Sequence, residues 1–91
     1  IVVANYLYRP LFSKILESLA PKGVLIYQTF AVGNEEYGRP RNPEYLLSND
    51  ELLKVFGKHL HVVQYSHGFI KQPSPAIMQS ICCINDKPLI N

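Results

Sequence analysis

The sequence predicts an α/β fold with a mostly parallel sheet that ends in an antiparallel hairpin. Short apolar runs rich in β-branched residues alternate with stretches of helical apolar spacing, in the order strand, helix, strand, helix, strand, strand. The first two strands are separated by one helix, which is typical of a parallel crossover. The last two are joined by a short link without a helix, so they are expected to be antiparallel.

The first half of the chain predicts a strand, a helix and a second strand. The apolar run Ile1-Val2-Val3-Ala4 suits a strand buried on both faces. Pro10 suits the first turn of a helix, and Pro21-Lys22-Gly23 ends it. The apolar face of this helix consists of Leu11, Phe12, Ile15, Leu16 and Leu19. A second strand is expected over Val24–Phe30.

The second half begins with a polar connection over residues 31–47, and loops of this length are usually functional or mobile. Ser48 with Glu51 three residues later is a capping-box pattern that predicts a helix, which Gly57 ends. Alternation over residues 61–67 predicts a half-exposed edge strand. The longer apolar run Ala76–Ile84 predicts an internal strand.

Composition excludes several classes of protein. The chain has 91 residues, 47% hydrophobic and 18% charged, which suits one small globular core. A net charge of +2 from scattered basic residues gives no reason to expect nucleic-acid binding. No apolar run is long enough to span a membrane, and no signal peptide is visible. Cys82 and Cys83 are adjacent, so on a strand they point to opposite faces and are poorly placed to pair or to share a metal. A reducing cytoplasm fits this cysteine usage best.

Three segments carry a resemblance to a known family. Leu19-Ala20-Pro21-Lys22-Gly23-Val24-Leu25-Ile26-Tyr27 resembles the "L-x-P-G-G-x-L-I" segment of class I S-adenosylmethionine-dependent methyltransferases, which joins the helix after strand four to strand five. Ile1-Val2-Val3-Ala4 followed by Asn5-Tyr6-Leu7 resembles strand four and its exit loop. Residues 27–43 resemble small bacterial methyltransferases of the tellurite-resistance or uncharacterised type. The resemblance covers essentially all 91 residues.

The resemblance implies that residues 1–91 form a single partial domain, the C-terminal half of a Rossmann-like methyltransferase sheet, with family strands four, five, seven and six side by side. Because the chain starts inside an apparent strand without an initiator Met, we expect it to be a fragment. The family binds its cofactor with a glycine-rich loop after strand one and an acidic residue after strand two. Gly33 and Gly38 are too far apart and follow the wrong strand to replace that loop. S-adenosylmethionine is therefore expected in the longer protein and not on this chain alone.

Ligands of open α/β sheets bind beyond the carboxyl ends of the parallel strands. Side chains there that can hydrogen-bond a methyl acceptor are Asn5, Tyr6, Tyr8 and Thr29, and Asn5 and Tyr6 also lie where a cofactor contact is possible. The alternative for Tyr6 and Tyr8 is packing at the rim of the core. Three guanidinium groups, of Arg9, Arg39 and Arg41, are candidates to bind an anionic acceptor.

The sequence suggests weaker hypotheses for several other acidic, histidine and apolar residues. Glu35 and Glu36 are candidate general bases without a perturbing partner. His59 and His61 would share one face of a strand, but two ligands without a third do not predict a metal site. His67 is expected at the surface or in a turn. Two further apolar residues, Phe69 and Met78, are expected in the core.

The sequence leaves three hypotheses for the function of the chain. The first is the acceptor half of a methyltransferase, inactive as an isolated chain. The second is a non-catalytic fragment that only folds and self-associates. The third is another Rossmann-like enzyme such as a nucleotide-dependent oxidoreductase, which the terminal hairpin disfavours. The first strand is also expected to be an exposed apolar edge, which predicts a homodimer through Ile1-Val2-Val3-Ala4 or pairing with the missing half.

Overall fold

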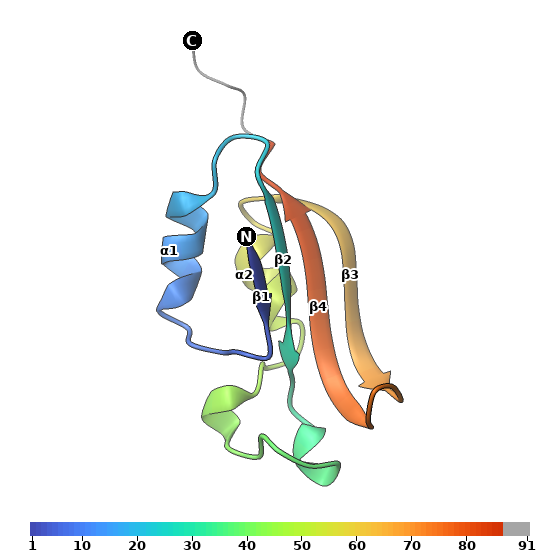
Figure 1. Ribbon diagram of the computed structural model, residues 1–91. Helices are drawn as coiled ribbons and strands as arrows, with labels where there is room; N and C mark the ends of the chain where they lie inside the picture. Colours follow the sequence, from blue (N-terminus) through green and yellow to red (C-terminus); the bar gives the residue numbers. More distant parts are fainter. Residues whose placement is uncertain (87–91) are drawn as a thin grey trace.

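The computed structural model describes residues 1–86 of the chain. It is an α/β structure with one mixed sheet of four strands in the order β1-β2-β4-β3 (Figure 1). The strands are β1 (Val2–Ala4), β2 (Val24–Phe30), β3 (His61–Ile70) and β4 (Ala76–Ile84). The helices are α1 (Leu11–Ser18) and α2 (Glu51–Phe56), with two short 3₁₀ helices, η1 (Asn34–Glu36) and η2 (Pro43–Tyr45), between β2 and α2. The predicted order of elements is confirmed, and so are an internal β4 and an edge β3.

The sheet is mixed: β1, β2 and β3 run in one direction and β4 runs in the opposite one, which confirms the predicted antiparallel hairpin of the last two strands. β1 pairs with β2 in parallel, whereas β4 is antiparallel to both β2 and β3. The physical reason is connectivity. Helix α1 joins β1 to β2, α2 lies on the connection from β2 to β3, and β4 follows β3 through a short link without a helix and lies between β2 and β3 in the sheet.

Both helices pack on the same face of the sheet and form the core there. Along β2, Leu25 and Tyr27 are fully buried, and their β4 partners Cys83 and Ile81 face the same side. The helices contribute an aromatic and aliphatic layer made of Phe12, Ile15, Leu52 and Phe56. The ring of Phe12 meets those of Tyr27 and Phe56 edge-on, with centroids 5.9 and 5.4 Å away. Such pairs contribute about 1 kcal/mol beyond the burial of their area.

The opposite face of the sheet is apolar and open. Val2, Ile26 and Cys82 lie in one row across three strands, because the registers pair Ile26 with both of the others. Val2 is 71% exposed and Ile26 is 43% exposed. The expectation that the first strand is buried on both faces is therefore wrong, since β1 is an edge strand with an uncovered face. We call Val2, Val24, Ile26, Cys82 and Ile84 the open face.

Helix α2 begins differently from the capping-box prediction. Glu51 accepts a hydrogen bond from the backbone N–H of Ser48 at 2.9 Å, which is one half of the box. The Ser48 hydroxyl, however, donates to the Glu51 carboxylate rather than capping a backbone N–H. The amide of Gln79 on β4 performs the capping: its oxygen accepts from the N–H of Leu52 at 3.1 Å, and its nitrogen donates to the carbonyl of Ser48.

Strand β3 extends to Ile70, three residues beyond the prediction. His67 therefore lies within a strand and not in a turn. Phe69 is 54% exposed and packs its ring against Tyr37, so its assignment to the core is wrong, whereas Met78 is buried as predicted. Strand β3 continues beyond His67 because β4 is long enough to provide pairing partners as far as Ala76.

Cys82 and Cys83 are free and lie on opposite faces of β4, as predicted. Cys83 is buried in the core, and burial raises the pKa of its thiol to about 11. Within residues 1–86, no helix combines the length and apolar character needed to cross a membrane.

Candidate functional site

The carboxyl ends of β1 and β2 lie side by side and form the candidate site. The parallel register pairs Ala4 with Gln28, so the next residues, Asn5 and Thr29, are neighbours. The N–H of Asn5 donates to the carbonyl of Gln28 at 2.8 Å, and Asn5 has a left-handed backbone with φ of 57°. This conformation turns the chain out of the sheet directly after β1. Asparagine tolerates it better than most residues.

A cavity of about 210 Å³ lies at these strand ends. Its walls come from the exit of β1, the end of β2 and the long connection, and consist of Asn5, Tyr6, Leu7, Thr29, Phe30, Pro40 and Tyr45. The structure thus brings together three of the predicted site residues: Asn5, Tyr6 and Thr29. Binding pockets for whole small molecules usually measure about 300–1,000 Å³, so this cavity has room for part of a ligand.

Tyr27 fixes the backbone that carries Tyr6. Its side chain is fully buried, and its hydroxyl donates to the carbonyl of Tyr6 at 2.7 Å. Burial raises the pKa of Tyr27 to about 12, so the phenol keeps the proton that this hydrogen bond requires. The side chain of Tyr6 is 55% exposed at the cavity rim. Tyr27 was missed as a site residue, because the sequence shows it only as one residue of an apolar strand.

The connection over residues 31–47 is anchored to the sheet at both ends. Ala31 and Leu47 form a parallel bridge and are fully buried. Within the connection, the buried Asn34 amide donates to the carbonyl of Pro40 at 3.2 Å and accepts from the N–H of Ile77 at 3.1 Å. Pro40 is thereby held at the cavity. The predicted placement of this connection over the strand ends agrees with the positions of Pro40 and Tyr45 in the cavity wall.

Arg9, a predicted anion-binding residue, is hydrogen-bonded to other groups of the chain. Its guanidinium holds Glu51 through two hydrogen bonds of 2.7 and 2.9 Å, and it donates to the carbonyls of Glu44 and Leu46. The hydrogen bond to Glu51 raises the pKa of Arg9. Burial alone would raise the pKa of Glu51, but hydrogen bonds from Arg9 and Ser48 outweigh it and hold that pKa below its ordinary value. This network ties three elements together and favours a structural role for Arg9.

The other two arginines flank the cavity without lining it. Arg39 and Arg41 are exposed on either side of Pro40, and among residues 1–86 neither forms a hydrogen bond or an ion pair. Their side chains are available to an anionic ligand next to the cavity. Glu35 accepts a hydrogen bond from the N–H of Gly33 at 2.9 Å and is exposed, as is Glu36. Neither glutamate lines the cavity.

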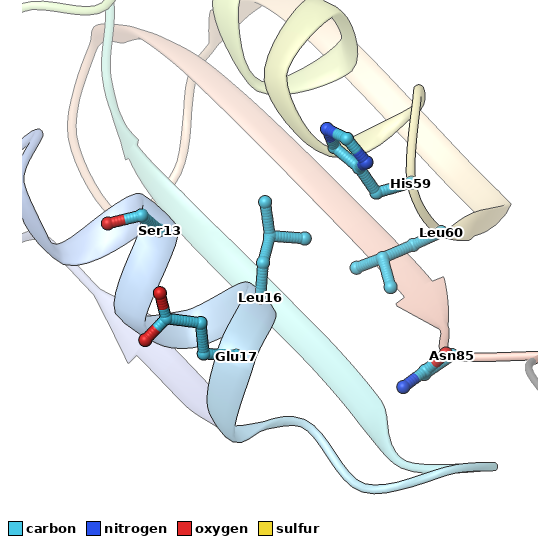
Figure 2. Close-up of a pocket in the computed structure, with 6 residues that line it drawn as sticks. All are labelled: Ser13, Leu16, Glu17, His59, Leu60 and Asn85. Atoms are coloured by element: carbon cyan, nitrogen blue, oxygen red, sulfur yellow. The ribbon is translucent and has the colours of Figure 1, made fainter.

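The histidines are separated by the fold. His59 precedes β3 and His61 is its first residue, so the expectation that they share one face of a strand is wrong. His59 borders a second cavity, of about 350 Å³, between α1 and the segment before β3 (Figure 2). Leu16 and Leu60 extend into that space. No group of three or more potential metal ligands occurs among residues 1–86.

The second cavity lies away from the strand ends. Asn85, which also lines it, donates its backbone N–H to the carbonyl of Gly23 at the beginning of β2. The amide of Asn85 donates to the carbonyl of Leu19 at 2.8 Å. This cavity is therefore at the end of the sheet where α1 finishes, opposite Asn5 and Thr29.

A polar cluster that the sequence pattern did not reveal joins α2 to β3. Asp50 accepts hydrogen bonds from the hydroxyl of Tyr65 at 2.7 Å and contacts Nδ1 of His67 at 3.2 Å. These two hydrogen bonds lower the pKa of Asp50. Since the three residues are 15 and 17 positions apart, only knowledge of the β3 register brings them together.

No protein-family model matches the chain, and no curated protein is significantly similar to it in sequence.

Proposed function

We propose that this chain is the acceptor-binding half of a class I S-adenosylmethionine-dependent methyltransferase and that it does not bind S-adenosylmethionine by itself. The observation that carries the proposal is the cavity at the carboxyl ends of the parallel pair, lined by Asn5, Tyr6 and Thr29. In open α/β sheets this is where ligands bind. The strand order β1-β2-β4-β3 supports the same reading, because it matches the order expected for family strands four, five, seven and six.

The proposed reaction, methyl transfer, requires the protein mainly to position the two reactants. Methyl transfer is a direct displacement at carbon, so the protein contributes mainly by positioning the two reactants. The side chain of Asn5 offers hydrogen bonds that orient an acceptor, Thr29 is an almost fully buried part of the cavity wall, and Tyr6 and Tyr45 offer aromatic walls. Arg39 and Arg41 suit a carboxylate or phosphate group on the acceptor.

Three features support a second half elsewhere. The cavity is smaller than a complete binding pocket, and the chain has no glycine-rich loop in which a backbone can approach a nucleoside cofactor closely. The open face, with Val24 and Ile26 each about two-fifths exposed, suits a covering layer, because α/β sheets are usually covered on both faces.

Calorimetry with S-adenosylmethionine tests the proposal. We expect no binding to the 91-residue chain, and micromolar binding with methyl transfer by the longer product of the same gene. In that product, Asn5→Ala should lower kcat/KM, whereas Tyr8→Phe, which lies outside the cavity wall, should leave it unchanged. Binding by the isolated chain would contradict the proposal, as would a longer product that does not bind S-adenosylmethionine. The second outcome would favour a non-catalytic α/β fragment.

A further inference from the structure

The outer edge of β1 presents backbone groups that the sheet does not use. The N–H of Ile26 donates to the carbonyl of Ile1, and the N–H of Asn5 donates to that of Gln28. In a parallel ladder, alternate residues bond to the same neighbour, so Ile1, Val3 and Asn5 face β2. Val2 and Ala4 therefore direct their N–H and C=O groups away from the sheet. Two donors and two acceptors are thus aligned on one short edge.

The two edges of the sheet differ in their protection. Natural sheets blunt their edges with charges, prolines and bulges. β3 has these features, with a bulge between Val62 and Gln64, and Lys71 and Pro73 directly after the strand. β1 pairs regularly and contains neither a charge nor a proline. β1 is therefore the edge of this sheet that is suited to accept another strand.

An apolar groove runs along β1 beside this edge. It has a volume of about 230 Å³ and lies between β1 and α1, with walls formed by Ile1, Val3, Leu11, Lys14, Ile15 and Ser18. Val3 packs partly against the core, on the same side of the sheet as α1. A strand added to β1 would place every second side chain over this groove.

We propose that a second copy of this chain occupies the edge, through antiparallel pairing of the two β1 strands about a two-fold axis at Val3. In this arrangement Val2 of each copy exchanges two hydrogen bonds with Ala4 of the other. All four outward backbone groups of each β1 are then paired. The result is a continuous sheet of eight strands with β3 at both ends.

The side chains match under the same symmetry. The two Val3 residues oppose each other as a close pair, about 4.5 Å between Cα atoms. Since Val3 faces α1, both copies bring Leu11 and Ile15 to this point, and the two apolar grooves close over the Val3 pair. On the other face, the larger Val2 lies against the smaller Ala4. The side chains of the segment carry no charge that would repel its copy.

The expected affinity of the dimer follows from the area of its interface. Stable protein dimers usually bury about 800 Å² on each partner, and a strand of three residues with one groove offers less than that. We therefore expect a weak dimer, with a dissociation constant on the order of 100 µM. The axis is perpendicular to the sheet, so the open faces of both copies remain accessible on the same side. In a longer methyltransferase of the kind proposed above, the other half would pair with this same edge of β1, so the dimer is proposed for the 91-residue chain.

Sedimentation velocity from about 10 µM to 1 mM tests the dimer. We expect the weight-average mass to rise toward twice that of the chain. Ala4→Pro removes one outward N–H and no hydrogen bond to β2, so it should abolish the rise. Ala4→Ser, which keeps that N–H, should associate as the wild type does. Circular dichroism of each variant verifies that the fold is retained.

Amide exchange on the unmodified chain gives an independent measurement. The amide of Ala4 should exchange more slowly as concentration rises, while that of Val3, which is bonded to β2, should not change. A chain that stays monomeric at 1 mM, roughly tenfold above the expected constant, overturns the proposal and leaves the edge for a strand of another polypeptide. A dimer that survives Ala4→Pro but is lost in Ile26→Thr also overturns it, because the open face is then the interface.

Discussion

Arg9 and Tyr27 determine, at the scale of single residues, where the candidate site lies. The hydroxyl of Tyr27 donates to the carbonyl of Tyr6, and the guanidinium of Arg9 donates to the carbonyls of Glu44 and Leu46. Side-chain donors therefore fix both the exit of β1 and the end of the long connection. These backbone carbonyls belong to irregular segments, so side-chain donors provide the hydrogen bonds that a regular helix or strand would provide from its backbone. The cavity therefore has two well-defined walls although both are loops.

The side chain of Arg9 should matter for stability more than any other arginine. Arg9→Met removes four hydrogen bonds, leaves Glu51 without its cationic partner, and should lower the free energy of unfolding by about 2 kcal/mol. Arg9→Lys should not restore it, because an ammonium cannot form the same forked contact. Urea unfolding measures both changes. Arg39→Met, at an exposed position, is the matched control and should have no effect. Equal losses for the two methionine variants would show that the network is not structural.

Tyr27 should make the fold sensitive to alkaline pH. Its folded-state pKa of about 12 lies above the ordinary tyrosine value near 10, so its stabilising effect is complete below pH 10 and is lost as the pH rises toward 12. We expect the free energy of unfolding to fall by up to about 2 kcal/mol from this residue across that range. Tyr65 and Cys83, whose pKa values are also raised, act in the same direction.

The Tyr27→Phe variant tests this assignment. At neutral pH it should cost about 1 kcal/mol, the usual net value of one hydrogen bond, and above pH 10 it should lose less stability than the wild type. Tyr8→Phe, in which the replaced side chain is 56% exposed, should follow the wild-type curve. Chemical unfolding at a series of pH values gives the comparison. If all three curves run parallel, Tyr27 does not titrate differently on folding.

The secondary-structure elements show what the sequence could and could not predict. Val24–Phe30 and Ala76–Ile84 were predicted at their observed bounds because continuous apolar runs mark strands with neighbours on both sides. The start of α2 was predicted near its true place for the wrong reason, since its cap comes from Gln79, 27 residues after Leu52. Periodicity does not encode such a long-range contact. For the same reason the Asp50, Tyr65 and His67 cluster could not be foreseen.

The side chain of Gln79 should stabilise the first turn of α2 and, with it, the fold. Its buried amide accepts from the N–H of Leu52 and donates to the carbonyl of Ser48, which also accepts from the N–H of Glu51. Gln79→Leu therefore leaves the buried N–H of Leu52 unpaired and removes one of the two hydrogen bonds to Ser48. The expected cost is about 2–3 kcal/mol in the free energy of unfolding. Faster amide exchange at Leu52 would locate the damage at the helix start. The exposed Gln64 on β3 provides the control, since Gln64→Leu should change little. A loss confined to thermal stability, with Leu52 exchange unchanged, would contradict the capping role.

The whole molecule is a sheet with helices on one side, and this follows from its connectivity. A right-handed crossover places α1 on one face, and the core residues of α2 join it there. The sequence predicted the strand order because the fourth strand is apolar throughout and the third alternates. It did not predict how exposed Val2, Val24 and Ile26 would be. Continuous apolar character indicates burial on both faces, but a pattern does not say which element provides the cover.

The open face should bind an apolar dye. Val24 and Ile26 are 41% and 43% exposed and lie side by side with Val2, so the isolated chain should enhance the fluorescence of anilinonaphthalene sulfonate. The double variant Val24→Thr with Ile26→Thr should lower that signal by at least about half. Its cost in stability should be small, about 1 kcal/mol for each site, because these side chains are already partly solvated. Val32→Thr replaces a valine of equal exposure, 40%, that lies outside the open face, and should leave the fluorescence unchanged.

Equal dye binding by all three proteins would mean that the sheet face is not the apolar surface in solution. A protein in which a covering layer packed on these same residues would bind less dye per molecule than the 91-residue chain does.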